Sequence, residues 1–162
     1  MNLLLLKQLS ILSVFAGAAL GLISVIPYVS MISFFIAFLF LSAFIIVYMK
    51  RNDLIGILSL REGCLFGAVV GFVSFLAFSV VYAPISMIIG AIFHSYTQGF
   101  LRFFVSAGLG STVVMIMLIV FSAGLSALFN GFTGLVTAYV YEIITGMRKD
   151  ANENTTIDFE IK

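Results

Sequence analysis

The sequence predicts an all-α fold: a polytopic bundle of helices that cross a lipid bilayer. Of the 162 residues, 62% are hydrophobic and only 9% are charged, whereas roughly 25% are charged in ordinary soluble domains. The charges are also clustered, so that residues 8–49, 63–101 and 103–141 contain no Asp, Glu, Lys or Arg. Each stretch exceeds the roughly 20 apolar residues that one helical crossing needs. The alternation of apolar and polar residues typical of a transmembrane β-barrel is absent.

The first charge-free stretch divides at Pro27. Proline has no amide hydrogen and disfavours helix in the residue before it, so we expect a tight turn here. This predicts a first span over about residues 8–26 and a second over about residues 30–49, each long enough for one crossing. A short polar loop, residues 50–61, follows the second span.

The second half of the chain allows two topologies. In the four-span prediction, which we favour, a third span covers about residues 62–83 and a fourth about residues 112–141, while residues 84–111 lie along the outer surface of the membrane. In the six-span alternative, the two later charge-free stretches each form a helical hairpin. The fourth helix of that alternative would be short and would contain several polar residues, which favours four spans.

The positions of lysine and arginine predict that both termini are cytoplasmic, because short cytoplasmic loops are enriched in these residues. Lys7, the polar loop and the basic pair that follows the last span all fall on one side if the number of spans is even. The transmembrane domain, residues 1–147, is then followed by a polar cytoplasmic tail, residues 148–162. We predict that this tail is disordered, because it has little apolar surface to bury.

Small residues recur at four-residue spacing on the expected spans, which places them on one face of each helix. In lipid, close backbone approach at small residues holds helices together, because no hydrophobic force presses them against each other. We interpret these faces as packing surfaces within the chain, with self-association as the alternative. The predicted packing residues are Ser13, Gly17 and Gly21 in the first span, Gly63, Gly67 and Gly71 in the third, and Ala127 and Gly131 in the fourth.

Five polar residues are candidates for function. His94, Gln98 and Arg102 would form one stripe of a helix that lies in the membrane interface or lines a water-filled path. Asn130 lies deep in the predicted fourth span, where an unpaired amide is costly, so we expect it to bond a neighbouring helix. With six spans it would lie in an outer turn. We expect Glu142 near the inner boundary, as a carboxylate that reaches the interface, with proton coupling as the alternative.

The sequence gives little support for a disulfide, a metal site, an enzyme active site or nucleic-acid binding. A single cysteine, Cys64, excludes an intramolecular disulfide and a cysteine-based metal cluster, and one histidine makes no metal site. We therefore expect no metal and no cofactor. No paired carboxylates or nucleophile–base set can be assembled, so we do not expect an enzyme. The net charge of +1 comes without a basic stripe, so nucleic acid is not an expected partner.

The order of several motifs resembles that of a known group of proteins. An apolar hairpin turns at Pro27, a basic exit (YMKR) follows at residues 48–51, and a loop ends in SLREG at residues 59–63. A glycine-spaced helix and the segment SALFNG, residues 126–131, come next. In this order the chain resembles uncharacterised small bacterial four-span membrane proteins, some of whose relatives carry a zinc ribbon. The resemblance implies four spans and a place in the bacterial cytoplasmic (inner) membrane, and it implies no activity.

Two functional hypotheses follow. The first is a non-enzymatic integral membrane protein that packs with itself or with a larger membrane partner, within the lipid bilayer. The second is a transporter or channel for a small solute, in which the stripe of His94, Gln98 and Arg102 faces a cavity. Transport machinery concentrates polar residues at the middle of the membrane, and this chain has few there, so we favour the first.

Overall fold

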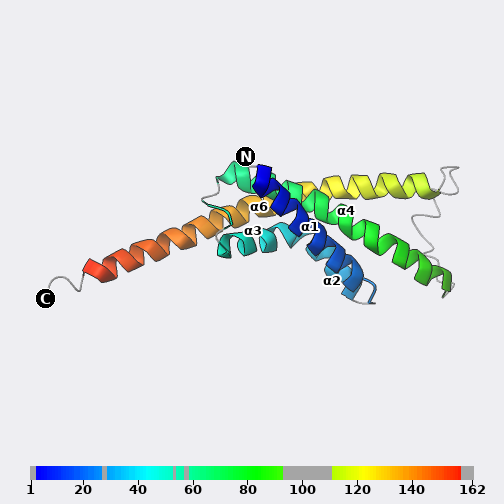
Figure 1. Cartoon of the computed structure of the whole chain (residues 1–162), viewed down its shortest axis with the longest axis horizontal. Helices are drawn as coiled ribbons and strands as arrows, with labels where there is room; N and C mark the ends of the chain where they lie inside the picture. Colours follow the sequence, from blue (N-terminus) through cyan, green and yellow to red (C-terminus); the bar gives the residue numbers. More distant parts are fainter. Residues whose placement is uncertain (1–2, 27–28, 53, 57–58, 93–110, 158–162) are drawn as a thin grey trace.

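The computed structural model describes residues 3–26, 29–52, 54–56, 59–92 and 111–157. All regular secondary structure within these ranges is helical (Figure 1). The elements are α1 (Leu3–Ile23), α2 (Val29–Phe35), the π-helical turn η1 (Ile36–Phe40), α3 (Leu41–Arg51), α4 (Leu60–Ile92) and α6 (Ser111–Ile157).

Four helical segments among the described residues are long and apolar enough to cross a membrane. They are Leu5–Ile23, Val29–Arg51, Leu60–Ser86 and Val113–Thr145. The second of them consists of α2, η1 and α3 joined end to end. The predicted all-α class and the predicted four helices of membrane-crossing length are therefore confirmed for the described part of the chain.

Side-chain burial is the reverse of that in a water-soluble helical protein. Ser42 and Asn130 are 0% exposed, whereas Phe15 and Leu128 are 71% and 72% exposed. Large apolar side chains are stable on an outer surface when that surface faces an apolar medium. Small polar groups tolerate the interior when each finds a hydrogen-bond partner. This distribution is the one expected of an integral membrane protein.

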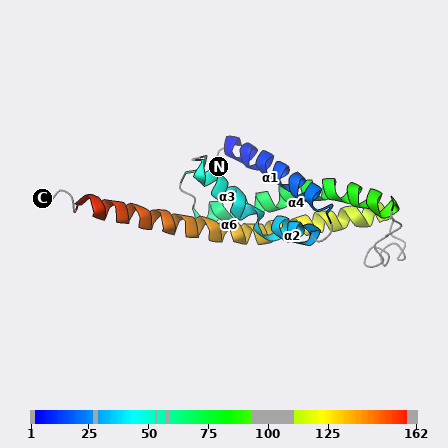
Figure 2. The same cartoon turned by 90° about the horizontal axis from the view of Figure 1, so that it is seen from below.

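Helix α4 is central to the packing, with α6 on one side and α1 on another (Figures 1 and 2). The first half of α4 lies close against α6, whereas the C-terminal half of α4 and the N-terminal half of α6 diverge (Figure 1). Helix α6 runs on past the other helices to the C-terminal end of the molecule (Figure 2). The apolar core comprises Leu9, Leu41, Ile45, Ile46, Met49, Ile55, Phe66, Val70 and Ala138.

A reciprocal pair of hydrogen bonds determines where α4 begins. Ser59 Oγ accepts a hydrogen bond from the backbone N–H of Glu62 at 3.3 Å, and the Glu62 carboxylate accepts one from the Ser59 N–H at 3.1 Å. This is a capping box, which satisfies amide groups that the first turn of a helix leaves unpaired. Leu60 follows directly as the first helical residue.

The end of α4 differs from the prediction. We expected the third span to end near Pro84 and residues 84–111 to lie along the membrane surface, but α4 continues through Pro84 to Ile92. Proline inside a helix removes one backbone hydrogen bond, yet transmembrane helices tolerate it where side chains bond nearby backbone groups. Close to Pro84, Ser86 Oγ donates a hydrogen bond to the carbonyl oxygen of Ala83 at 2.9 Å, while the carbonyl that the missing proline N–H leaves without its helical donor is that of Val80. The rest of the predicted surface segment, residues 93–110, lies outside the described residues.

Helix α6 is longer than predicted at its C-terminal end. It continues to Ile157, so α6 includes residues 148–157 of the segment that we predicted as a disordered tail. Extending an existing helix avoids the cost of nucleation, although five of the ten residues 148–157 are Asp, Asn or Thr, which have low helix propensity. Helix α6 also passes unbroken through Asn130 and Gly131, which contradicts the outer turn of the six-span alternative.

Candidate functional site

The second span contains a π-helical turn, η1, that faces α6. Such turns widen the helix and occur frequently at functional sites. The carbonyl groups of Ala37, Phe38 and Leu39 within this turn accept hydrogen bonds from side chains of α6. Backbone groups of one span are thus paired by side chains of another, in a region where water is scarce.

Asn130 is the centre of this pairing and is completely buried. Its Nδ2 donates to the carbonyl oxygens of Phe38 at 2.9 Å and Ala37 at 3.2 Å. Its Oδ1 accepts a bond from the Ser42 N–H at 2.9 Å, and Ser42 Oγ donates to the Asn130 carbonyl at 2.8 Å. The expectation that Asn130 bonds a neighbouring helix therefore agrees with the geometry, and its partners are backbone groups at and just after the π-turn.

Two further side chains of α6 join Asn130. Ser126 Oγ donates to the carbonyl oxygen of Gly71 at 3.1 Å, and Thr133 Oγ1 donates to that of Leu39 at 2.8 Å. Ser126, Asn130 and Thr133 are spaced i, i+4 and i+7, so they share one face of α6. We call these three residues and Ser42 the polar cluster. Of these four residues, only Asn130 was predicted as a candidate from the sequence, although the spacing of Ser126, Asn130 and Thr133 on one helix face was a signal for the other two residues of α6.

Glycines of α4 bring α6 close to the polar cluster. A Cβ built at Gly67 would lie 2.1 Å from the Asn130 carbonyl oxygen, and one built at Gly71 would lie 2.5 Å from that of Ser126. Real Cβ atoms do not approach so closely, so only glycine fits at either position. Gly63 is similarly tight, with its built Cβ 2.7 Å from that of Ala138.

The predicted packing face of the first span lies against α4. A Cβ at Gly17 would lie 2.1 Å from the Ser74 carbonyl oxygen, and one at Gly21 would lie 2.9 Å from that of Phe78. Ser13 is buried and donates to the carbonyl of Leu9 in its own helix at 2.7 Å.

On α6, a Cβ built at Gly131 would lie 3.3 Å from the Cys64 carbonyl oxygen of α4. Ala127, the other predicted packing residue of this helix, is half-buried. Within the described part of the chain, the glycine faces of the first and third spans are therefore occupied by contacts between helices of the same molecule.

An ion pair joins the end of α3 to α6. Lys50 Nζ donates to Glu142 Oε1, and the side chain of Lys50 is 6% exposed while that of Glu142 is 33% exposed. Lys50 Nζ also lies 5.2 Å from the ring centroid of Tyr141, where the face of the ring attracts a cation. We expected Glu142 as a carboxylate that reaches the interface, and the structure places it against Lys50.

An apolar groove opens where α4 and α6 diverge, with a volume of about 230 Å³. Aromatic rings from α4 and from the second span form one wall, with Phe34 and Phe75 in an edge-to-face contact at a centroid separation of 5.8 Å. The groove is lined by Phe34, Phe75, Phe78, Ser79, Tyr82, Ala83, Met115, Leu118, Ile119 and Ser122. We call it the α4–α6 groove.

His94, Gln98 and Arg102 lie outside the described residues, so their stripe stays a prediction. Within the described ranges, no group of three or more His, Cys, Asp or Glu side chains could hold a metal ion. Cys64 is a half-buried free thiol.

Comparisons with protein-family models, with curated proteins and with solved structures give no match to this chain. The resemblance to small bacterial four-span proteins therefore gains no support from them.

Proposed function

We propose that this chain is a non-enzymatic interaction subunit of a membrane, which associates through the α4–α6 groove with a second copy of itself or with a larger membrane protein. Four apolar helices suit such a protein. The polar groups inside it hold its own helices together, as the bonds of Asn130, Ser126 and Thr133 to other spans illustrate. Its outward surface offers apolar contact.

The observation that carries the proposal is the composition of the α4–α6 groove. Ser79 and Ala83 are spaced i and i+4 on α4, and Ser122 lines the groove from α6. Helices pack closely in membranes where small residues at this spacing let their backbones approach. Phenylalanine and methionine side chains beside these small residues supply apolar contact area for an incoming helix.

The glycine faces do not support the association that they suggested in the sequence. Gly17 and Gly21 contact α4, and Gly67 and Gly71 contact α6, so a partner could reach these glycines only if the chain's own helices separated. The α4–α6 groove, as formed by the described residues, is open without such separation. It therefore replaces the glycine faces as the proposed association surface.

Substitution of Ala83 by leucine tests the proposal, because the larger side chain would fill the groove. Sedimentation in mild detergent and native electrophoresis of solubilised membranes should show the wild-type chain in a complex larger than a monomer, and Ala83→Leu should reduce that complex at least several-fold. Val80→Leu is the matched control, since Val80 lies on the same helix and is 68% exposed on the outer surface.

Circular dichroism and thermal unfolding would show whether Ala83→Leu still folds. A wild-type chain that is monomeric by both methods at all concentrations would contradict the proposal. So would a folded Ala83→Leu variant whose complexes match those of the wild type.

A further inference from the structure

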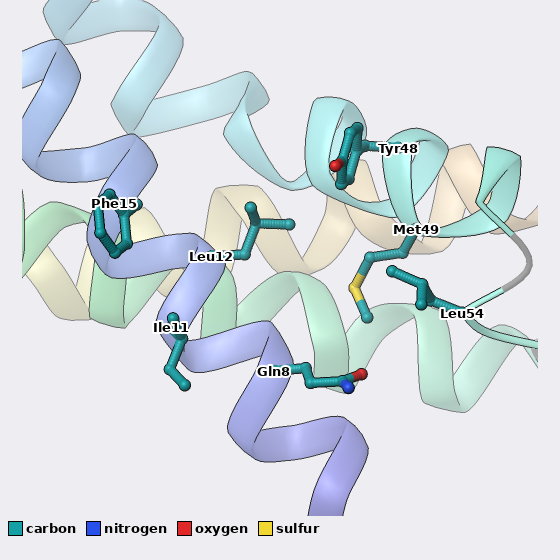
Figure 3. Close-up of a pocket in the computed structure, with 7 residues that line it drawn as sticks. All are labelled: Gln8, Ile11, Leu12, Phe15, Tyr48, Met49 and Leu54. Atoms are coloured by element: carbon teal, nitrogen blue, oxygen red, sulfur yellow. The ribbon is translucent and has the colours of Figure 1, made fainter.

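A second groove lies between α1 and α3, close to the loop that joins α3 to α4. It has a volume of about 270 Å³ and is lined by Gln8, Ile11, Leu12, Phe15, Tyr48, Met49 and Leu54 (Figure 3). The four residues from α1 are spaced i, i+3, i+4 and i+7, so the groove follows about two helical turns, or roughly 10 Å. Figure 3 shows Gln8 beside Met49 and Leu54 at one end, with Phe15 at the other.

The two ends of this α1–α3 groove differ in chemistry. Phe15 is 71% exposed at the apolar end. Near the Gln8 end, exposed basic residues are close in the sequence to lining residues: Lys7 precedes Gln8, and Arg51 lies two residues after Met49, while Asp53, which precedes Leu54, brings one negative charge. The basic residue between Met49 and Arg51, Lys50, is already paired with Glu142. An elongated ligand with an apolar chain and an anionic head would match this gradient.

The lining favours a flexible chain over a transmembrane helix. Small residues dominate helix–helix contacts in membranes, yet no glycine, alanine or serine lines this groove. An engineered apolar cavity of about 150 Å³ is large enough to bind benzene. By the same measure, 270 Å³ holds an apolar segment on the order of ten carbon atoms. That is part of one acyl chain.

We propose that the α1–α3 groove binds an anionic phospholipid, with one acyl chain between the two helices and the phosphate at the level of Lys7 and Arg51. Basic residues beside grooves between transmembrane helices are a known means of binding anionic head groups. The proposal rests on the membrane location of the chain. It does not depend on association through the α4–α6 groove.

Native mass spectrometry of the full chain in mild detergent tests the proposal. The protein would be incubated with equal amounts of phosphatidylglycerol and phosphatidylcholine that carry the same acyl chains. We expect the monomer to retain phosphatidylglycerol over phosphatidylcholine. The double variant Lys7→Gln/Arg51→Gln should lower this preference by about thirtyfold, the effect of two basic residues near an anionic surface.

Two further variants separate the head from the chain. Ile11→Trp places a larger side chain in the groove at a residue that is 50% exposed, and it should lower retention of both lipids. Arg61→Gln removes an exposed basic residue of α4, a helix that contributes no residue to the lining of this groove, and it should leave the preference unchanged.

Equal retention of the two lipids by the wild type would overturn the proposal, as would a preference that survives the double variant. Groove occupation by a second copy would also overturn it, and would appear as a dimer that Ile11→Trp disperses without changing lipid retention. Lipid retention is measured on the monomer by native mass spectrometry. Association through the α4–α6 groove is measured by comparing the complexes of the wild type and Ala83→Leu. The two proposals can therefore fail separately.

Discussion

At the scale of single residues, buried polar side chains form hydrogen bonds with backbone groups of the π-turn η1, which faces a neighbouring helix. Both ends of the Asn130 side-chain amide are paired: its Nδ2 donates to carbonyl oxygens, and its Oδ1 accepts from the Ser42 N–H. Leaving such groups unpaired in an apolar interior is costly, whereas a completed network specifies one arrangement of the helices. The polar cluster thus aligns the second span with α6.

Thr133 and Thr137 offer a matched test of this alignment. Both hydroxyls bond the carbonyl four residues earlier in α6, but only that of Thr133 also bonds another span, at Leu39. Thr133→Val should lower the free energy of unfolding by about 1 kcal/mol more than Thr137→Val, since it removes a hydrogen bond between two spans. Equilibrium unfolding in mixed micelles measures the free energies of unfolding of the two variants. Equal losses would mean that the Thr133–Leu39 bond contributes little.

The pairing of Lys50 with Glu142 is the other residue-scale feature that the sequence did not reveal. The sequence placed both near the inner boundary of the membrane, but they lie far apart in the chain. Only the packing of α3 on α6 brings them together. An almost buried ammonium group needs such a partner, because the cost of removing its hydration is otherwise uncompensated.

At the scale of the elements, glycine determines how closely α4 approaches its neighbours. Four-residue spacing predicted the faces, and the structure shows which helix each face contacts. The face of α1 contacts α4, and that of α4 contacts α6. No pattern within one helix could have identified these partners, since glycine offers the same flat surface to any neighbour.

Gly67 and Gly124 test the steric origin of this approach. A Cβ at Gly67 would lie 2.1 Å from a carbonyl oxygen, whereas one at Gly124 has no described atom within 4 Å beyond its own surroundings in the helix. Gly67→Ala should lower the free energy of unfolding by about 1–3 kcal/mol through overpacking. Gly124→Ala should raise it by up to about 1 kcal/mol through helix propensity. Unfolding in mixed micelles gives both values, and a neutral Gly67→Ala would contradict the close contact.

At the scale of the whole molecule, the exposed basic residues determine the predicted orientation. Lys7, Arg51 and Arg61 lie at the ends of helices on one side of the spans, and Ile26 lies beyond the opposite end of α1. The excess of lysine and arginine predicts that the first side is cytoplasmic.

Cysteine labelling in intact cells tests this orientation. In a Cys64→Ala background, Ile26→Cys should react with a membrane-impermeant maleimide, because Ile26 is 56% exposed beyond α1 on the predicted outer side. Asn52→Cys, in the loop after α3, should react only after the membrane is opened. The opposite pattern would reverse the predicted topology, and labelling of both residues in intact cells would contradict the second span.

The helical class, the long apolar helices and the faces of small residues were predictable from the sequence alone, which left four and six spans open until α6 was seen to pass unbroken through Asn130. These features depend on local composition and spacing, which act through the cost of unpaired backbone in lipid and through helix periodicity. Tertiary structure alone decided that α4 passes through Pro84, that η1 meets Asn130, and that Lys50 pairs with Glu142. Each of these depends on a group from a distant part of the chain, and its energy appears only when the helices pack.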